Sequence, residues 1–313
     1  MSTQPVIEFD SVSRWYGDVL GINRVTTAIG RGITGLLGAN GSGKSTLMNL
    51  ACGLLRPSQG RVRVFGEPSW NNPGIHRRLG FCPQHDSFYE LMTGFEFVYA
   101  LLALRGYDRP TTRRLAEEAL ERVDLADAMN KRIASYSKGM RQRVKVALAL
   151  ADVPDVLVLD EPLNGLDARS RHDTIQLIQN YGREGRCVLI SSHILHEIES
   201  LTDNILMLSQ GYLLAEGDVR EVRGLLRRIP HTVYLRCSAP RRLAALMFDL
   251  PGLVGVSLTP EEDAVAVKTY DLDAFYMRLN DVVLEHGIEV NYTSVADESI
   301  QAVFEYLSGG NHE

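Results

Sequence analysis

The chain has 313 residues, a length that suits one large domain or two modest ones. Hydrophobic residues make up 45% of it, the share of an ordinary globular protein that buries a sizeable core. The formal net charge of −6 disfavours, without excluding, proteins that hold nucleic acid or an anionic membrane surface by overall charge.

The cysteine spacing and the lengths of the apolar runs show which kinds of protein this chain is not expected to be. The four cysteines (Cys52, Cys82, Cys187 and Cys237) lack the paired spacing of a zinc site and are expected to be buried reduced thiols. No basic stretch followed by an apolar core opens the chain, so we expect no signal peptide. The longest apolar run, FVYALLAL at residues 97–104, is far shorter than the about 20 residues of a membrane-spanning helix. Any action at a membrane is therefore expected to go through a partner.

Short strands and glycine-rich turns open the chain. Strands are predicted at VIEFD (6–10), GITGLLG (32–38) and GRVRVFGE (60–67), and the helix KSTLMNLACGLL (44–55) follows the second strand. Between residues 91 and 151 apolar residues recur three and four apart, which predicts a block of helices.

The middle of the chain returns to strands. The predicted elements are the strand 155–160, a polar helix near Ala168, the strand 186–192, a short helix from Ile194 and a hairpin at 204–218. Strands that alternate with helices predict an α/β fold with a largely parallel sheet. The helices at 91–151 are then a subdomain inserted into this first domain, residues 1–220.

A second domain is predicted at residues 221–313. A basic helix, GDVREVRGLLRRIP at 217–230, ends at a proline and marks the boundary. Beyond it the pattern β-α-β-β-α-β predicts a small α+β domain of the ferredoxin-like kind.

A phosphate-binding loop is the most specific motif. GANGSGKST fits G-x-x-x-x-G-K-[ST], follows a predicted strand and opens a predicted helix. Glycines let backbone amides close around phosphates, Lys44 can reach the β- and γ-phosphates, and the Ser45 hydroxyl is placed for Mg²⁺. The predicted nucleoside triphosphate site consists of Gly38, Ala39, Asn40, Gly41, Ser42, Gly43, Lys44, Ser45 and Thr46.

Two carboxylates follow an apolar strand in VLVLDEP. Asp160 and Glu161 stand at its carboxyl end, the edge at which open α/β sheets bind ligands. We expect Asp160 to hold Mg²⁺ through its water shell and Glu161 to orient and deprotonate the attacking water. Alone, such a pair is more often a helix cap or a solvated turn. The phosphate loop favours the functional interpretation.

A second anion-binding turn is predicted in YSKGMRQR (136–143), where a turn opens a helix with free backbone amides. With this turn the chain resembles the nucleotide-binding subunit of an ABC (ATP-binding cassette) transporter. That family's signature is usually Leu-Ser-Gly-Gly-Gln, which Ser137 and Gly139 match and Lys138 and Met140 do not. The resemblance implies that Ser137 and Gly139 bind the γ-phosphate of ATP held by a second subunit in a head-to-tail dimer. The alternative is that Ser137 only caps a surface helix.

Other positions match the same family in order. Gln84 in FCPQHDS matches the Q-loop glutamine, expected at the metal and the γ-phosphate. Asp167 in LNGLD matches the D-loop aspartate that helps to set the facing subunit's phosphate loop. His193 in LISSHILHE matches the histidine that contacts the γ-phosphate. Tyr16 in SRWYGD matches the aromatic that stacks on adenine, with Trp15 as the alternative ring.

The resemblance covers about the first 220 residues and implies an ATPase that uses ATP and Mg²⁺. The catalytic residues of this ATPase would be Glu161, His193, Gln84 and Lys44. The form SKGMRQR resembles ATPases of ABC-2-type exporters, and so does the ending SVADESIQAVFEYLSGG (294–310). The role of the second domain stays open between an accessory structural one and regulation or bracing of a dimer.

The partners implied are a separate transmembrane permease and a second ATPase subunit, as a homodimer or heterodimer. The protein would then be cytoplasmic and peripheral on the inner face of the cell membrane, without direct membrane insertion and without nucleic acid. An importer's ATPase is the first alternative. The second is a soluble ABC protein acting on ribosomes or DNA, which the single compact cassette and the acidic charge disfavour.

Overall fold

The computed structural model describes residues 5–219, 230–248, 250–259 and 264–295. It divides the chain into two compact units, Met1–Val219 and Arg220–Glu313, which are described separately. Within the described ranges no helix is both long and apolar enough to span a membrane. The helix expected at 217–230 and the ending at 294–310 fall mostly in the ranges 220–229 and 296–313, outside the described residues.

A six-stranded sheet organises the first unit. Its strands, in spatial order, are β10 (Tyr212–Asp218), β9 (Asn204–Ser209), β3 (Gly32–Leu37), β8 (Cys187–Ser192), β7 (Val156–Asp160) and β6 (Leu79–Cys82). All neighbours from β9 to β6 are parallel, and β10 pairs antiparallel at one edge. Every residue of β7 and β8 is buried, as expected for strands covered on both faces. The predicted parallel sheet is confirmed, and it brings the loops after β3, β6, β7 and β8 to one edge.

Among the helices that pack on this sheet are α1 (Lys44–Ala51), α6 (Ala168–Arg183) and α7 (Leu195–Glu199). Helix α1 touches β7 on the main sheet and also the strands of a second sheet, and its Leu47, Met48 and Leu50 are fully buried in one apolar cluster. It ends at Ala51 rather than at residue 55, because Gly53 takes a left-handed φ of 68°.

The second sheet of this unit is antiparallel, in the order β2-β1-β4-β5. Its strands are β1 (Ile7–Tyr16), β2 (Val19–Ile29), β4 (Gln59–Val64) and β5 (Glu67–Pro68). Strand β2 was not predicted from the sequence. The inner residues Ile7, Phe9 and Val62 join the same cluster as α1, so this sheet closes the core over the phosphate-loop helix.

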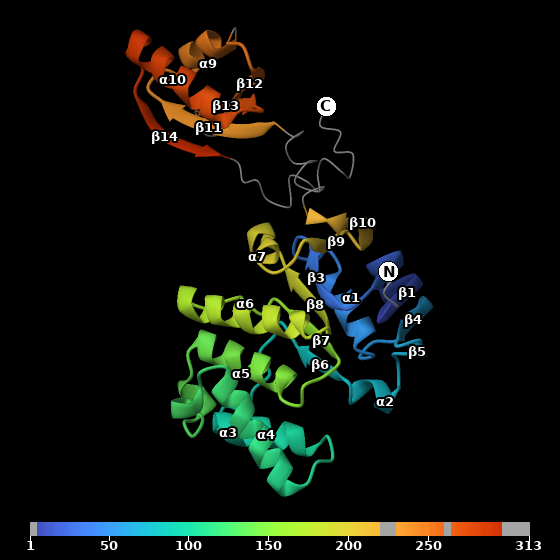
Figure 1. Ribbon diagram of the computed structural model, residues 1–313. Coiled ribbons are helices and arrows are strands. Elements are labelled where there is room, and N and C mark those ends of the chain that lie inside the picture. Colours follow the sequence, from blue (N-terminus) through green and yellow to red (C-terminus); the bar gives the residue numbers. More distant parts are fainter. Residues whose placement is uncertain (1–4, 220–229, 249, 260–263, 296–313) are drawn as a thin grey trace. The chain divides into compact units, whose positions relative to one another are not determined.

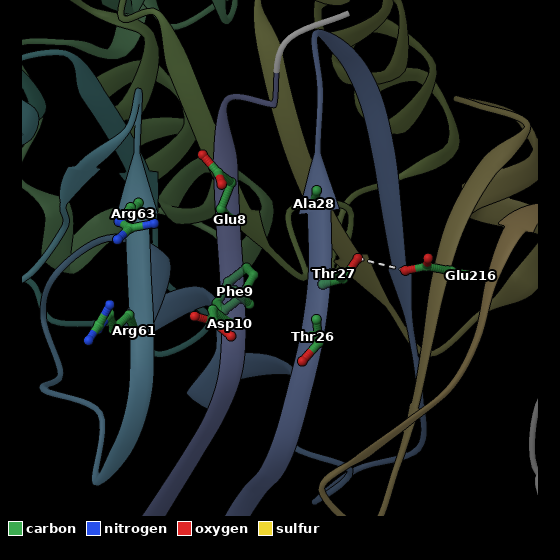
Figure 2. Close-up of a pocket in the computed structure, with 9 residues that line it drawn as sticks. All are labelled: Glu8, Phe9, Asp10, Thr26, Thr27, Ala28, Arg61, Arg63 and Glu216. Carbon is green, nitrogen blue, oxygen red and sulfur yellow. Dashed lines mark hydrogen bonds between the residues drawn. The ribbon is translucent and has the colours of Figure 1, made fainter. Parts of the chain in front are cut away.

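The outer face of the antiparallel sheet carries a shallow hollow of about 380 Å³ (Figure 2). Glu8 and Asp10 of β1 stand opposite Arg63 and Arg61 of β4, so opposite charges face each other across neighbouring strands. Such pairs stabilise the solvated face of an antiparallel sheet. We therefore assign this hollow a structural role, although it is larger than the hollow of about 150 Å³ at the phosphate loop.

The inserted helices are confirmed. They are α3 (Gly94–Ala103), α4 (Arg109–Arg122) and α5 (Lys138–Leu150), with short 3-10 turns at Ala126–Ala128 and Ile133–Ser135. A further short helix, α2 (Pro73–His76), precedes β6. Figure 1 shows α3, α4 and α5 as one group, coloured green, apart from the blue antiparallel sheet. Helix α5 is the member that contacts both β6 and β7, so it joins the insert to the main sheet.

The second unit has the predicted β-α-β-β-α-β order. Its elements are β11 (His231–Cys237), α9 (Pro240–Phe248), β12 (Leu253–Thr259), β13 (Ala264–Thr269), α10 (Leu272–His286) and β14 (Val290–Val295). The sheet order β12-β13-β11-β14, with every pair antiparallel, is the ferredoxin-like arrangement. One apolar cluster contains Leu243 of α9, Phe275 of α10 and Val265 of β13, so both helices cover the same face.

Candidate functional site

The phosphate loop joins the end of β3 to the start of α1. Gly43, the residue before the helix, has a φ of 106°, and a Cβ there would lie 2.7 Å from the Gly21 carbonyl oxygen. A Cβ on Gly38 would lie 2.6 Å from the Leu208 carbonyl oxygen. Both positions therefore require glycine, and the turn leaves the amino end of α1 facing the hollow.

Two polar side chains of this loop are poised for an anion. Lys44 is 6% exposed, and its ammonium donates to the carbonyl oxygens of Gly38 (2.7 Å) and Ala39 (3.1 Å). Burial lowers the pKa of Lys44, while the Glu161 carboxylate works against that shift. The buried hydroxyl of Ser42 has no hydrogen-bond partner among the residues that the structure describes. An unpaired hydroxyl, an ammonium and free amides fit a phosphate chain.

The predicted loop residues other than Gly38 and Ala39 line the same hollow. Its wall is formed by Gly21, Asn40, Gly41, Ser42, Gly43, Lys44, Ser45, Thr46 and Gln84. Gln84 comes two residues after β6 ends and is exposed. The structure therefore brings Gln84 to the phosphate loop, at the edge where the carboxyl ends of the parallel strands lie.

Asp160 and Glu161 lie at the carboxyl end of β7 and are 3% and 4% exposed. Ser191 of β8 holds both: its hydroxyl donates to Asp160 Oδ1 (2.6 Å) and accepts from the Glu161 backbone N–H (2.9 Å). The sequence analysis did not single out Ser191. Its role follows from the register of the parallel pair, in which Asp160 lies beside Ser191.

Glu161 is the centre of a charged cluster. Its Oε2 lies 2.9 Å from His193 Nδ1, and its Oε1 lies 3.8 Å from Lys44 Nζ. Burial raises the pKa of Glu161, while His193 and Lys44 oppose that rise. Its backbone φ is 52°, a region that glutamate rarely occupies. Strained backbone of this kind is concentrated at functional sites.

The turn that carries His193 is held by two buried residues. The Ser192 hydroxyl donates to Glu197 Oε2 (2.7 Å) and accepts from the Ile194 N–H (2.9 Å). Glu197 is 8% exposed and belongs to α7. Neither Ser192 nor Glu197 was singled out from the sequence.

Tyr16 lies at the end of β1, beside the phosphate loop. Its hydroxyl is 3.3 Å from Thr46 Oγ1, its ring is 43% exposed, and the Arg14 guanidinium stands 5.0 Å from the ring centre. Trp15 is half-buried in the same strand. Tyr16 therefore presents a partly exposed ring next to the phosphate loop.

Ser137 and Gly139 are not among the residues that line this hollow. Ser137 is the N-cap of α5, where its hydroxyl accepts from the Met140 N–H at 3.2 Å. A Cβ on Gly139 would lie 3.4 Å from the Gly165 carbonyl oxygen, so the signature turn packs on residues 163–167 of the same chain.

Asp167 caps α6, where its carboxylate accepts from the N–H and the hydroxyl of Ser170, both at 2.9 Å. These bonds hold the pKa of Asp167 below its usual value. The side chains of Ser137 and Asp167 are thus both used as caps, and both residues are exposed on the surface.

Known proteins are similar to this chain in sequence and in fold. A family model described as ABC transporter matches residues 22–164. The chain is 31% identical to the daunorubicin/doxorubicin resistance ATP-binding protein DrrA of Streptomyces peucetius, over 99% of this chain and 94% of that protein. It is 28% identical to the bacitracin transport ATP-binding protein BcrA of Enterococcus faecalis, over 99% and 98%.

Solved structures give the same result for the first unit. The dimeric structure of MJ0796, a bacterial ABC transporter cassette, matches 68% of this chain and 99% of its own, with 26% identity and a TM-score of 0.64. An ATP-binding subunit of an ABC transporter matches 70% of this chain and 92% of its own, with 27% identity and a TM-score of 0.63.

Proposed function

This chain belongs to the ABC transporter family as an ATP-binding subunit, and we propose on that premise that it drives export through a separate membrane-spanning permease. The observation that carries the proposal is the buried Glu161 carboxylate, held between His193 and Lys44 beside the phosphate loop. Export is supported by the SKGMRQR form of the signature and by relatives named for daunorubicin/doxorubicin resistance and bacitracin transport.

The nucleotide would bind along the phosphate loop. Backbone amides of residues 38–46 and the Ser42 hydroxyl would hold the phosphates, and Lys44 would exchange its carbonyl partners for phosphate oxygens. The Tyr16 ring, exposed beside Thr46, would stack on adenine.

The residues also suit Mg²⁺. Ser45, Asp160 and Gln84 offer hydroxyl, carboxylate and amide oxygens, the hard ligands that this ion prefers. Mg²⁺ is usually held by one or two carboxylates, with phosphate oxygens and water completing the shell. When bound, Mg²⁺ supplies neutralisation of phosphate charge.

Hydrolysis needs a base and an ordered water. Burial raises the pKa of Glu161, which makes its carboxylate a better proton acceptor for that water. His193 orients the carboxylate at 2.9 Å and, with Gln84, would complete the γ-phosphate surroundings. The Ser191 hydroxyl holds the Asp160 carboxylate and the backbone N–H of Glu161.

Ser137 and Gly139 would serve ATP held by a second subunit, a role supported by their not lining this chain's own phosphate hollow. Asp167 would help to set the facing phosphate loop. A head-to-tail pair of cassettes, identical or closely related, would then clamp two ATP molecules, and closure and reopening would move the permease. The subunit would act on the cytoplasmic face of the membrane.

The test is the mass of Glu161→Gln in solution, with and without ATP–Mg²⁺. Loss of the base should block turnover and trap a closed pair, which appears as a doubling of mass. Ser137→Arg added to Glu161→Gln should prevent the doubling while each monomer still binds ATP. Ser135→Arg, exposed two residues upstream, is the matched control and should leave the doubling intact. ATP binding without any doubling would refute the homodimeric clamp, and unimpaired hydrolysis by Glu161→Gln would refute the role of the base.

A further inference from the structure

Helix α5 begins at the signature turn and carries two polar side chains into the interior of the first unit. Gln142 and Lys145 are each 5% exposed. A buried amide or ammonium is costly unless it is hydrogen-bonded, so the partners of these side chains show what holds them in place.

Gln142 holds the backbone of the loop that follows β7. Its Nε2 donates to the Pro162 carbonyl oxygen at 3.0 Å and to the Glu161 carbonyl oxygen at 3.3 Å. Because both partners are carbonyls, the amide must present its NH₂ group to them. Glu161 has the left-handed φ of 52°, so these bonds hold a strained peptide that aims the Glu161 carboxylate.

Lys145 holds the loop that carries Gln84. Its ammonium donates to the Gln84 carbonyl oxygen at 3.0 Å and pairs with Asp86 Oδ1 at 2.9 Å. One helix thus holds the backbone of two loops that supply side chains to the nucleotide site. Ser137 caps that same helix, about 7.5 Å along the axis from Gln142.

We propose that Gln142 and Lys145 are positioning residues that tie the signature turn to Glu161 and Gln84 of the same subunit. The proposal rests on the function proposed above, in which the signature turn binds the partner's nucleotide. An α-helix moves as a rigid element, so docking of Ser137 on that nucleotide shifts α5 and, through these side chains, both loops. Each subunit then aligns its own base in response to the nucleotide that its partner holds.

The test compares Gln142→Leu and Lys145→Met with the parent in steady-state ATP hydrolysis by the full chain. Loss of either tie should lower kcat about tenfold or more, because misplacement of a catalytic group by about 1 Å is costly. KM for ATP should stay within about twofold, since the phosphate loop and Lys44 are untouched. Lys145→Arg, which keeps a donor, should recover most of kcat.

Val144→Ala is the matched control, a truncation of a fully buried apolar side chain on the same helix. It should destabilise the fold without lowering kcat. In the Glu161→Gln background, Gln142→Leu and Lys145→Met should still show the ATP-dependent doubling of mass. An unchanged kcat, or a fall in kcat equal to that of Val144→Ala, would overturn the positioning role. Failure of the parent to hydrolyse ATP, or of Glu161→Gln to double in mass, would instead overturn the proposed function.

Discussion

Glu161 and His193 meet across the ends of β7 and β8, with Oε2 and Nδ1 2.9 Å apart. The Glu161 side chain is 3% exposed and the His193 side chain 44%. His193 thus contacts the buried Glu161 carboxylate while part of its own side chain faces solvent. Burial raises the pKa of Glu161, and the neighbouring histidine and Lys44 moderate that rise. The carboxylate is consequently a stronger base than an exposed one and costs stability when it ionises.

That cost predicts a pH-dependent gain in stability for Glu161→Gln. A raised pKa means that the folded state binds the proton more tightly than the unfolded chain, so this stabilisation is present at acidic pH and lost as pH rises through the raised pKa. Glutamine has no charge to desolvate. The Tm of Glu161→Gln should exceed that of the parent at about pH 8, and the difference between the two Tm values should disappear toward about pH 4. Each 1 kcal/mol regained corresponds to about 2–4 °C in Tm.

Thermal unfolding followed by circular dichroism across this pH range gives the measurement. Asp173→Asn, an exposed carboxylate on α6, is the control and should shift Tm little at any pH. A Glu161→Gln variant with the parent's Tm throughout would contradict the direction of the pKa shift.

Ser191→Ala should damage catalysis more than it damages the fold. The hydroxyl bridges Asp160 and the Glu161 N–H, so its removal frees both the Asp160 carboxylate, proposed to hold Mg²⁺, and the backbone of Glu161, the proposed base. We expect kcat to fall at least about tenfold, with a higher Mg²⁺ requirement.

Ser69→Ala is the matched control variant, since Ser69 is also buried and donates to the Leu50 carbonyl oxygen at 2.9 Å. It should lose similar stability, about 1 kcal/mol, with kcat unchanged. Equal effects of the two variants on kcat would exclude a special role for Ser191.

The motifs that could be predicted from the sequence are those formed by elements that follow one another directly along the chain. The phosphate loop needs only a strand, a glycine-rich turn and a helix in succession, and the structure has β3, residues 38–43 and α1 in that order. Ser191 and Gln142 could not be predicted, because each acts on residues far along the chain. Ser191 reaches Asp160 only once β7 and β8 are known to be parallel neighbours in that register.

Strand β2 was missed for a related reason. Its apolar alternation is broken by Gly21 and Asn23, and Arg24 has a φ of 46°. Its pairing with β1 shifts register at several points. A strand of this kind is specified by its neighbours, because its inner residues Ile22, Val25 and Ile29 gain burial only when β1 and α1 are in place.

Tyr16 and Trp15 give a direct comparison of two candidate rings. Tyr16 is exposed beside Thr46, whereas Trp15 is half-buried. Tyr16→Ala should raise KM for ATP about fivefold with kcat unchanged, because stacking contributes about 1 kcal/mol to ground and transition states alike. Tyr16→Phe keeps the ring and should bind ATP like the parent. If Trp15→Ala raises KM and Tyr16→Ala does not, the assignment of the two rings must be exchanged.

Gly165→Ala should weaken nucleotide-driven pairing through Lys138. Gly165 has a φ of 77°, and a Cβ there would lie 2.7 Å from Lys138 Cε, so the lysine and the signature turn must shift. In the Glu161→Gln background we expect the ATP concentration for half-maximal dimer to rise about tenfold.

Gly185→Ala is a closely matched control, because Gly185 has the same φ of 77° and a Cβ there would have nothing within 4 Å. It carries the same backbone strain, about 1 kcal/mol, and should pair normally. Adding Lys138→Gly to Gly165→Ala removes the clash and should restore part of the pairing. If Gly185→Ala weakens pairing as much as Gly165→Ala does, backbone strain rather than the contact with Lys138 is responsible.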